Sequence, residues 1–354
     1  MLTPQQISEI REHLEKAQNP VFFFDNDPDG LCSFLLLQRW VGRGKGVSIR
    51  SFPELDKSYF RKVDELKADY VFVLDKNSVS EGFLEECLKI NIPVVWIDHH
   101  VVPEEMKERL GKFDYYNPQY NTGKNKSGEA VTSLCSQVVN NEKDDWLSVV
   151  GSIFDRYFPE EAYKSFKEKY PELAIDSEDE WEIYYNSEIG KIARIFSFAL
   201  KDRTTNIVRM TKFLMDVKSP NEVLEESNGN KTMHSRFKEI NQKYQILLEK
   251  AKQEGSVLDN EDQVLFFRYS GDLSISSDLS DELVYSFKDK IVVVNFVTGN
   301  KVNVSVRGKN IKEKVLKIIS EFEGATGGGH DNAVGAMIQV KDLEKFKEEL
   351  ERIF

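Results

Sequence analysis

The fold is decided by residues 21–30, VFFFDNDPDG, in which four apolar residues lead directly into three alternating acids. The apolar run at 21–24 is typical of a short, fully buried strand. The acids are Asp25, Asp27 and Asp29, and an apolar helical segment at 31–40 follows them. A strand that runs through an acidic turn into a helix predicts the beginning of an open parallel sheet.

Strand and helix patterns go on alternating up to about residue 100. We expect further strands at 47–51, 70–74 and 92–97, with helices at 59–66 and 80–89 between them. Because parallel strands need crossover connections, this order predicts an α/β fold with helices on both faces of the sheet.

The rest of the chain predicts a helical extension and a second, smaller α/β domain. The stretch 226–231, ESNGNK, is the most linker-like, and 233–254 has the pattern of one long polar helix. Strands are expected at 264–268, 291–296, 301–307 and 334–340, and helices at 311–322 and 343–353, with a Gly-rich turn before the last strand. We therefore predict a first domain with its helical extension at 1–215, a linker and connecting helix at 216–256, and a second domain at 257–354.

Composition narrows the class of protein. The chain has 354 residues, of which 48 are Lys or Arg and 60 are Asp or Glu, so its net charge is −12. Such an acidic chain is not expected to coat itself with nucleic acid non-specifically. No apolar run approaches the roughly 20 residues that a membrane helix needs. The polar N-terminal segment does not resemble a secretory signal, and three scattered cysteines predict neither a disulfide framework nor a zinc site. We expect a cytoplasmic protein.

Acids end three of the four predicted strands. Asp25, Asp27 and Asp29 follow the first, Asp75 follows the third, and Asp98-His99-His100 follows the fourth. Asp155 comes after another apolar stretch, 149–154. Since ligands bind at the carboxyl ends of the strands of an open sheet, these groups are expected to meet.

The chemistry of that edge indicates divalent metal. Carboxylates crowded into one site repel one another unless positive charge lies between them, and mixed carboxylate and imidazole ligation suits Mn²⁺ or Mg²⁺. Taken singly, each motif has a simpler interpretation. The first is an acidic turn or part of a calcium loop, Asp75 is a helix cap, and the paired histidines are surface or core residues.

The motifs together resemble those of a known family. DNDPDG (25–30), VFVLDKN (71–77), VVWIDHH (94–100), GSIFDR (151–156) and GGGHDNAVGAMI (327–338) match, in order, the motifs of the DHH phosphoesterase superfamily with a DHH-associated C-terminal domain. RecJ-like exonucleases, nanoRNases and cyclic-dinucleotide phosphodiesterases belong to this superfamily. The first motif resembles the RecJ-like branch, because it has three acids and Leu31 after the glycine.

The resemblance implies a role for each site residue. Asp25, Asp27 and Asp29 would supply metal ligands, and Asp75 would bridge two ions. Asp98 would support the histidines, His99 would bind metal, and His100 would contact the scissile phosphate. Asp155 would complete the second metal's ligands. Two such ions activate water and stabilise both oxygens of an in-line displacement.

Two features of the small domain are candidates for phosphate binding, and the resemblance implies that the first of them contacts the nucleotide. Gly327-Gly328-Gly329-His330 can bring backbone amides close to a phosphate, and His330 can donate to it. The alternative is a helix C-cap followed by a turn. Arg307, at the end of a predicted strand, has a fork that suits phosphate oxygens, or it is a solvated strand-end charge.

We therefore expect a Mn²⁺- or Mg²⁺-dependent phosphodiesterase, a RecJ-like exonuclease that hydrolyses single-stranded DNA, RNA or short oligonucleotides from an end by a two-metal mechanism. Only residues 331–354 follow His330, so we expect no additional OB-type domain and short or weakly held substrates. One alternative is a phosphodiesterase of cyclic dinucleotides or small phosphorylated nucleotides. Another is a non-catalytic scaffold in a replication or repair assembly. A homodimer or such partner proteins are further expectations.

Overall fold

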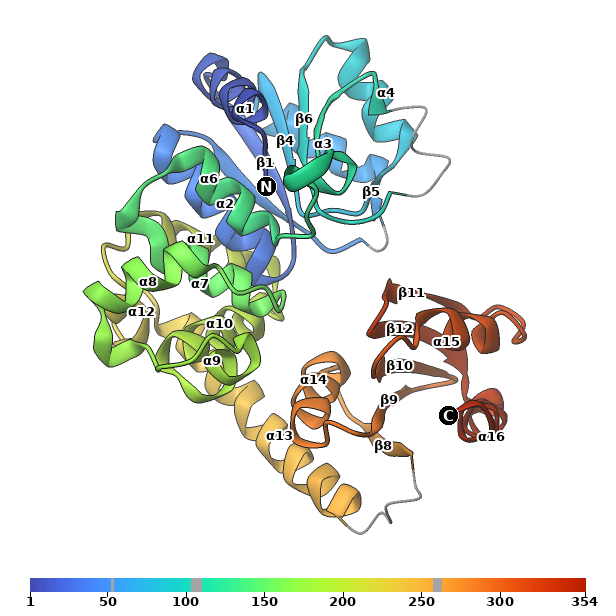
Figure 1. Cartoon of the computed structure of the whole chain (residues 1–354). Coiled ribbons are helices and arrows are strands. Elements are labelled where there is room, and N and C mark those ends of the chain that lie inside the picture. The colour runs from blue at the N-terminus through green and yellow to red at the C-terminus, as the bar shows by residue number, and fades with distance from the viewer. Residues whose placement is uncertain (52–53, 103–109, 257–262) are drawn as a thin grey trace. The chain divides into compact units, whose positions relative to one another are not determined.

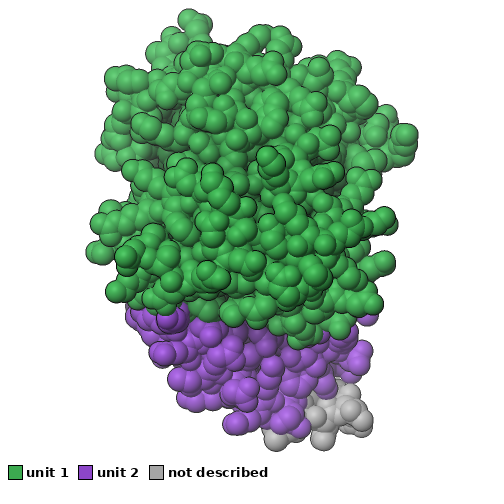
Figure 2. All heavy atoms as spheres, turned by 90° about the vertical axis from the view of Figure 1, so that its left-hand side faces the viewer, with its two compact units in different colours: residues 1–237 green, residues 238–354 purple. Residues whose placement is uncertain are grey.

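The computed structural model describes the whole chain except residues 52–53, 103–109 and 257–262. The described residues form two compact units, Met1–Phe237 and Lys238–Phe354, coloured separately in Figure 2. No helix in the described part is long and apolar enough to cross a bilayer. The predicted start of the second domain, residue 257, lies outside the described residues, so the predicted domain boundaries stay a prediction.

A five-stranded, all-parallel sheet lies at the centre of the first unit (Figure 1). Its order is β2-β1-β4-β6-β7. The strands are β1 (Pro20–Asp25), β2 (Lys45–Ile49), β4 (Tyr70–Leu74), β6 (Val94–Ile97) and β7 (Asp114–Tyr116); the short β3 (Glu54–Leu55) and β5 (Ser78–Val79) pair separately. The predicted parallel sheet is confirmed. Strand β7 was not predicted, because three residues with one charge carry no strand pattern.

Both faces of this sheet are buried, which explains why its strands are continuously apolar. Phe22 and Phe24 of β1 pack into one core, whereas Val21 and Phe23 pack into a second core on the other face. The crossover helices are α2 (Pro28–Val41), α3 (Phe60–Glu65) and α4 (Glu81–Lys89), and α1 (Pro4–Lys16) precedes the sheet. Helix α1 was not predicted, although Thr3 caps it and Ile10 and Leu14 are buried along it.

The helical extension follows the sheet. Its helices are α6 (Val131–Val139), α7 (Asp145–Phe154), α8 (Glu160–Lys169), α9 (Glu180–Asn186), α10 (Glu188–Leu200), α11 (Thr204–Asp216) and α12 (Pro220–Leu224). The stretch at 226–231 is an ordered turn, in which buried Asn230 donates to the carbonyls of Glu222 and Glu225 at 3.0 and 2.8 Å. It leads into the long helix α13 (Lys231–Ser256), which runs from the first unit into the second.

The second unit has its own mixed sheet, in the order β11-β12-β10-β9-β8. The strands are β8 (Val264–Ser270), β9 (Ile291–Thr298), β10 (Lys301–Arg307), β11 (Thr326–His330) and β12 (Ala333–Gln339), and the helices are α14 (Ser276–Ser286), α15 (Lys312–Ile319) and α16 (Leu343–Ile353). Only the β8–β9 pair is parallel among the described strands of this sheet. Helix α14 was not predicted, because its serines and acids weaken its apolar pattern.

The Gly-rich segment 327–330 is a strand rather than the predicted turn. It forms the edge strand β11, paired antiparallel with β12 so that Gly328 lies opposite Gly335. The turn itself is Asp331-Asn332. Glycine has a low strand propensity, and here the neighbouring strand β12 overrides it.

Candidate metal centre

The candidate site lies where the order of the first sheet reverses. The chain passes from β1 to β2 on one side of β1 and then crosses to β4 on the other, and open α/β sheets bind ligands at such a switch point. Asp25 is the last residue of β1, and Asp75 directly follows β4. Because β1 and β4 are neighbouring parallel strands, both acids lie at the same edge of the sheet.

The sequence predicted a helix that begins after the acidic motif, at residue 31. In the structure, helix α2 begins inside the motif, at Pro28. Asp27 is its N-cap and accepts a hydrogen bond from Gly30 N at 2.9 Å, and Pro28 takes the first turn. A Cβ on Gly30 would lie 2.6 Å from the carbonyl oxygen of Asp25. The motif therefore needs glycine here, since α2 packs directly against the backbone at the end of β1.

Backbone hydrogen bonds fix the third and fourth strand ends. Asp75 N donates to Ile97 O at 3.0 Å, and Asp98 N donates to Tyr116 O at 3.1 Å. Asp75 has a φ of +58°, a left-handed conformation that Asp tolerates but that is uncommon outside glycine. Helix α4 is capped by Ser80, so the simpler interpretation of Asp75 as a helix cap is not supported.

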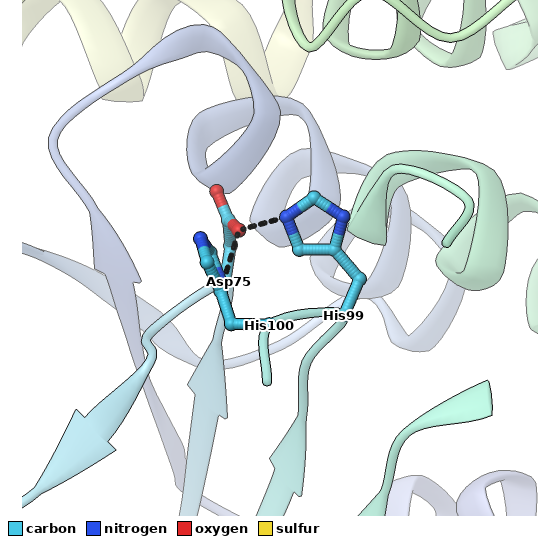
Figure 3. A group of neighbouring side chains, drawn as sticks. All are labelled: Asp75, His99 and His100. Atoms are coloured by element: carbon cyan, nitrogen blue, oxygen red, sulfur yellow. Dashed lines mark ion pairs between the residues drawn. The ribbon is translucent and has the colours of Figure 1, made fainter. Parts of the chain in front are cut away.

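The histidines form a compact group with Asp75 (Figure 3). His99 Nε2 lies 3.6 Å from Asp75 Oδ1 and 3.2 Å from Asp155 Oδ2, and His100 Nδ1 lies 3.9 Å from Asp75 Oδ1. Asp75 and His99 are buried, whereas the His100 side chain is 22% exposed. The three side chains converge from the ends of two neighbouring strands, β4 and β6.

Asp98 contacts the group through His100. Its Oδ1 lies 2.7 Å from His100 Nδ1, and the Asp98 side chain is fully buried. Burial lowers the pKa of His100, but the charge and hydrogen bond of Asp98 outweigh it and raise that pKa to about 9. Asn117 Nδ2 also donates to His100 O at 2.7 Å. His100 is thus held in place at both its ring and its backbone.

Asp29 has both a structural and a chemical role. Its two carboxylate oxygens accept from Val131 N at 2.9 Å and Thr132 N at 2.7 Å, so it satisfies the first amides of α6. Burial, then the nearby charge of Asp155, raises the pKa of Asp29 to about 6. The carboxylate therefore belongs to a residue of α2 and is held by the backbone amides of α6.

Two groups of described side chains have the spacing of a metal site. They are Asp29, His99 and Asp155, and Asp75, His99 and His100, and in each group the potential ligand atoms lie within 4.8 Å of one another. Neither of these groups of described residues includes Asp25 or Asp27. Of the predicted metal ligands, Asp29, Asp75, His99 and Asp155 therefore belong to these groups, and His99 belongs to both.

The electrostatics of the cluster fit a divalent cation. Burial is the largest cause of a pKa well above the ordinary value for both Asp27 and Asp75, and the neighbouring carboxylates raise it further. Asp75 Oδ1 is buried and accepts no hydrogen bond from any described residue. Crowded, buried carboxylates with an orphaned oxygen favour oxygen-seeking ions such as Mn²⁺ or Mg²⁺.

A lysine that the sequence analysis gave no role lies in the site. Lys76, which directly follows Asp75, is 2% exposed and donates to Asp25 Oδ1 at 3.0 Å and to Ser51 O at 2.9 Å. In the sequence, Lys76 is noticeable only as the neighbour of Asp75. No sequence pattern indicates that its ammonium group points inward to Asp25.

The phosphate-binding candidates of the second unit lie on separate strands of its sheet. His330 ends β11 and is exposed, and Gly329 has a φ of +146°. The Arg307 side chain, at the end of β10, is only 11% exposed: it pairs with Asp281 and donates to Ser277 Oγ at 2.8 Å. The simpler interpretation of Arg307 as a solvated strand-end charge is therefore wrong, and its guanidinium group is already held within its own domain.

Two family models match the chain, one in each unit. Residues 21–152 match the family model of the DHH family N-terminal domain, and residues 262–354 match that of the DHHA1 domain. No curated protein sequence matches the chain.

Solved structures show the same fold at low identity. RecJ from Thermus thermophilus in complex with Mn²⁺ is similar with a TM-score of 0.70 and 15% identity over 100% of this chain. This chain spans 55% of that RecJ. An exonuclease RecJ bound to manganese has a TM-score of 0.64 and 15% identity, covering 100% of this chain and 94% of its own. The DHH domain of PF0399, described as a member of the s1p family of ribosomal proteins, has a TM-score of 0.69 and 16% identity, covering 98% and 89%.

Proposed function

Because the chain belongs to the DHH phosphoesterase superfamily, with a DHH domain and a DHHA1 domain, we propose that it is a divalent-cation-dependent phosphodiesterase. Its substrates would be single-stranded DNA or RNA, or short oligonucleotides. The observation that carries the proposal is the convergence of Asp29, Asp75, His99 and Asp155 at one edge of the sheet. The similar RecJ structures bound to Mn²⁺ support this choice of cation.

Each residue of the cluster has a part in this proposal. Asp29, His99 and Asp155 would hold one cation, Asp25 and Asp27 would contribute to a second, and Asp75 would serve both. When bound, such cations lower the pKa of water and stabilise the charge that develops on an attacked phosphate. His100, oriented by Asp98, would donate a hydrogen bond from Nε2 to a non-bridging phosphate oxygen.

The second unit would bind the substrate and not the metal. Backbone amides of the edge strand β11 and the imidazole of His330 are suited to a phosphate away from the one that reacts. Arg307 would reach a phosphate only by sharing its guanidinium group with Asp281.

A panel of labelled substrates tests the proposal. DNA and RNA oligomers labelled at the 5′ or the 3′ end would be incubated with the chelated protein and then with Mn²⁺ or Mg²⁺, beside a cyclic dinucleotide. We expect no hydrolysis in chelator, recovery with Mn²⁺, and weaker recovery with Mg²⁺. Full activity in chelator would contradict the metal mechanism. Hydrolysis of the cyclic dinucleotide alone would favour the small-molecule alternative, and inactivity on all substrates would favour a scaffold.

A further inference from the structure

Lys76 is unusual among the charged residues of this protein. Among the residues that the structure describes, it is the one lysine or arginine that is buried, at 2% exposure. A buried ammonium group is stable only when a partner compensates its charge. Here the partner is Asp25, whose Oδ1 lies 3.0 Å from Lys76 Nζ. A protein cation thus lies beside a carboxylate expected to bind metal.

The surrounding structure fixes this pair. The indole of Trp96, buried on β6, donates from Nε1 to the carbonyl oxygen of Lys76 at 2.9 Å. Lys76 Nζ also donates to Ser51 O at 2.9 Å, and Asn26 N donates to the same Asp25 oxygen at 3.0 Å. Contacts at both ends of the lysine hold the ammonium group against Asp25.

The negative charge of the acids at this edge of the sheet is consequently offset at one position and not at the others. Asp25 is offset by Lys76, whereas no lysine or arginine in the described part of the chain forms an ion pair with Asp29, Asp75 or Asp155. A divalent ion near Asp25 would experience repulsion from a fixed positive charge. An ion between Asp29, His99 and Asp155 would be closest to carboxylates that have no such offset.

We propose that Lys76 makes the two cation positions unequal. One divalent ion binds tightly where Asp29, His99 and Asp155 meet, and the position that needs Asp25 binds its ion at least about tenfold more weakly, because Lys76 offsets one negative charge there. This inference rests on the proposed two-cation function and deepens it. Lys76 is a positioning residue that sets how many ions the resting protein holds.

Metal binding without substrate tests the inference separately from activity. Mn²⁺ would be titrated into the chelated protein, and bound ions would be counted by equilibrium dialysis with elemental analysis. Electron paramagnetic resonance would distinguish isolated ions from exchange-coupled pairs. Wild type should bind one ion tightly and show an isolated-ion spectrum until Mn²⁺ is in large excess. Two ions of equal affinity in wild type would overturn the inference, whether or not the protein hydrolyses any substrate.

Substitutions test whether Lys76 causes the difference in affinity between the two cation positions. Lys76→Met should tighten the second ion about tenfold or more and give a coupled spectrum at two equivalents of Mn²⁺. Lys76→Arg, which keeps the charge, should behave as wild type. Asp25→Asn should lose the weak ion and keep the tight one. The control is Lys57→Met, at an exposed lysine that pairs with Glu86 at 2.9 Å, and it should change neither affinity.

Three outcomes would refute Lys76 as the cause. The first is a Lys76→Met protein that folds but keeps the wild-type affinity ratio. The second is a Lys76→Arg protein with two tight ions. If Lys76→Met does not fold, Asp25→Asn decides: loss of the tight ion there would show that Asp25 belongs to the strong position, contrary to the inference.

Discussion

Replacing Asp98 by Asn tests how the site controls a histidine. Asp98 Oδ1 lies 2.7 Å from His100 Nδ1, and no part of Asp98 is exposed to solvent. Asn keeps the size of the side chain and removes its charge. The rise in the pKa of His100 from 6.5 to about 9 corresponds to about 3 kcal/mol in favour of the protonated ring. Because Asp98 is the main cause that raises this pKa, most of that free energy should be lost.

The expected result is a large fall in the pKa of His100. In Asp98→Asn, burial acts against the protonated ring and the weaker charges of Asp155 and Asp25 oppose it, so the pKa should return to near or below its ordinary value of 6.5. The measurement is a titration of the imidazole resonances by NMR in the metal-free protein, with His100→Gln to assign the signal.

The same shift has a consequence for stability. A histidine with a raised folded-state pKa stabilises the fold fully below its unfolded pKa, and this contribution is lost as the pH rises through the folded pKa. The metal-free wild type should therefore lose up to about 3 kcal/mol more unfolding free energy than Asp98→Asn between about pH 6.5 and 9.

A matched control is available elsewhere in the chain. Asp114 Oδ2 lies 3.5 Å from Nε2 of a different histidine, His13, and the Asp114 side chain is 47% exposed. Because Asp114→Asn removes a carboxylate from beside His13 and not from beside His100, it should leave the His100 titration unchanged. If the pKa of His100 stays near 9 in Asp98→Asn, then Asp98 does not control the charge of this ring and the reasoning is wrong.

Three further substitutions address the metal, the substrate and the fold. Asp75→Ala should abolish turnover and lower the bound Mn²⁺ measured by elemental analysis, because Asp75 would serve both ions; near-normal values of both would contradict that role. His330→Ala should leave metal content unchanged and slow turnover of an oligonucleotide, raising its activation free energy by about 1.5–3 kcal/mol, the range for a charge-assisted contact. Loss of metal would instead place His330 in the metal site. Gly30→Ala should lower the free energy of unfolding by about 1–3 kcal/mol, measured by denaturant titration, because the new Cβ meets backbone atoms of Asp25 that cannot yield; wild-type stability would show that the helix shifts freely.

The sequence by itself determined the parallel sheet and the set of residues at its edge. The apolar runs at 21–24, 70–74 and 94–97 are buried on both faces, and such runs are recognisable because every position must be apolar. Acids directly after those runs must lie at one edge, since parallel strands end on the same side. Short or polar elements such as β7 and α14 were missed, because their formation depends on neighbours that a local pattern does not contain.

Only the tertiary structure decided how the edge residues differ from one another. Asp29 is bound to the amides of α6, about 100 residues further on, and Asp98 turns toward His100 and not toward the acids. Lys76 points at Asp25 because Trp96 and Ser51 hold it there. The Gly-rich segment became a strand through pairing with β12. Such contacts depend on side-chain direction and on partners distant in the chain, whereas sequence pattern records only residue type and local period.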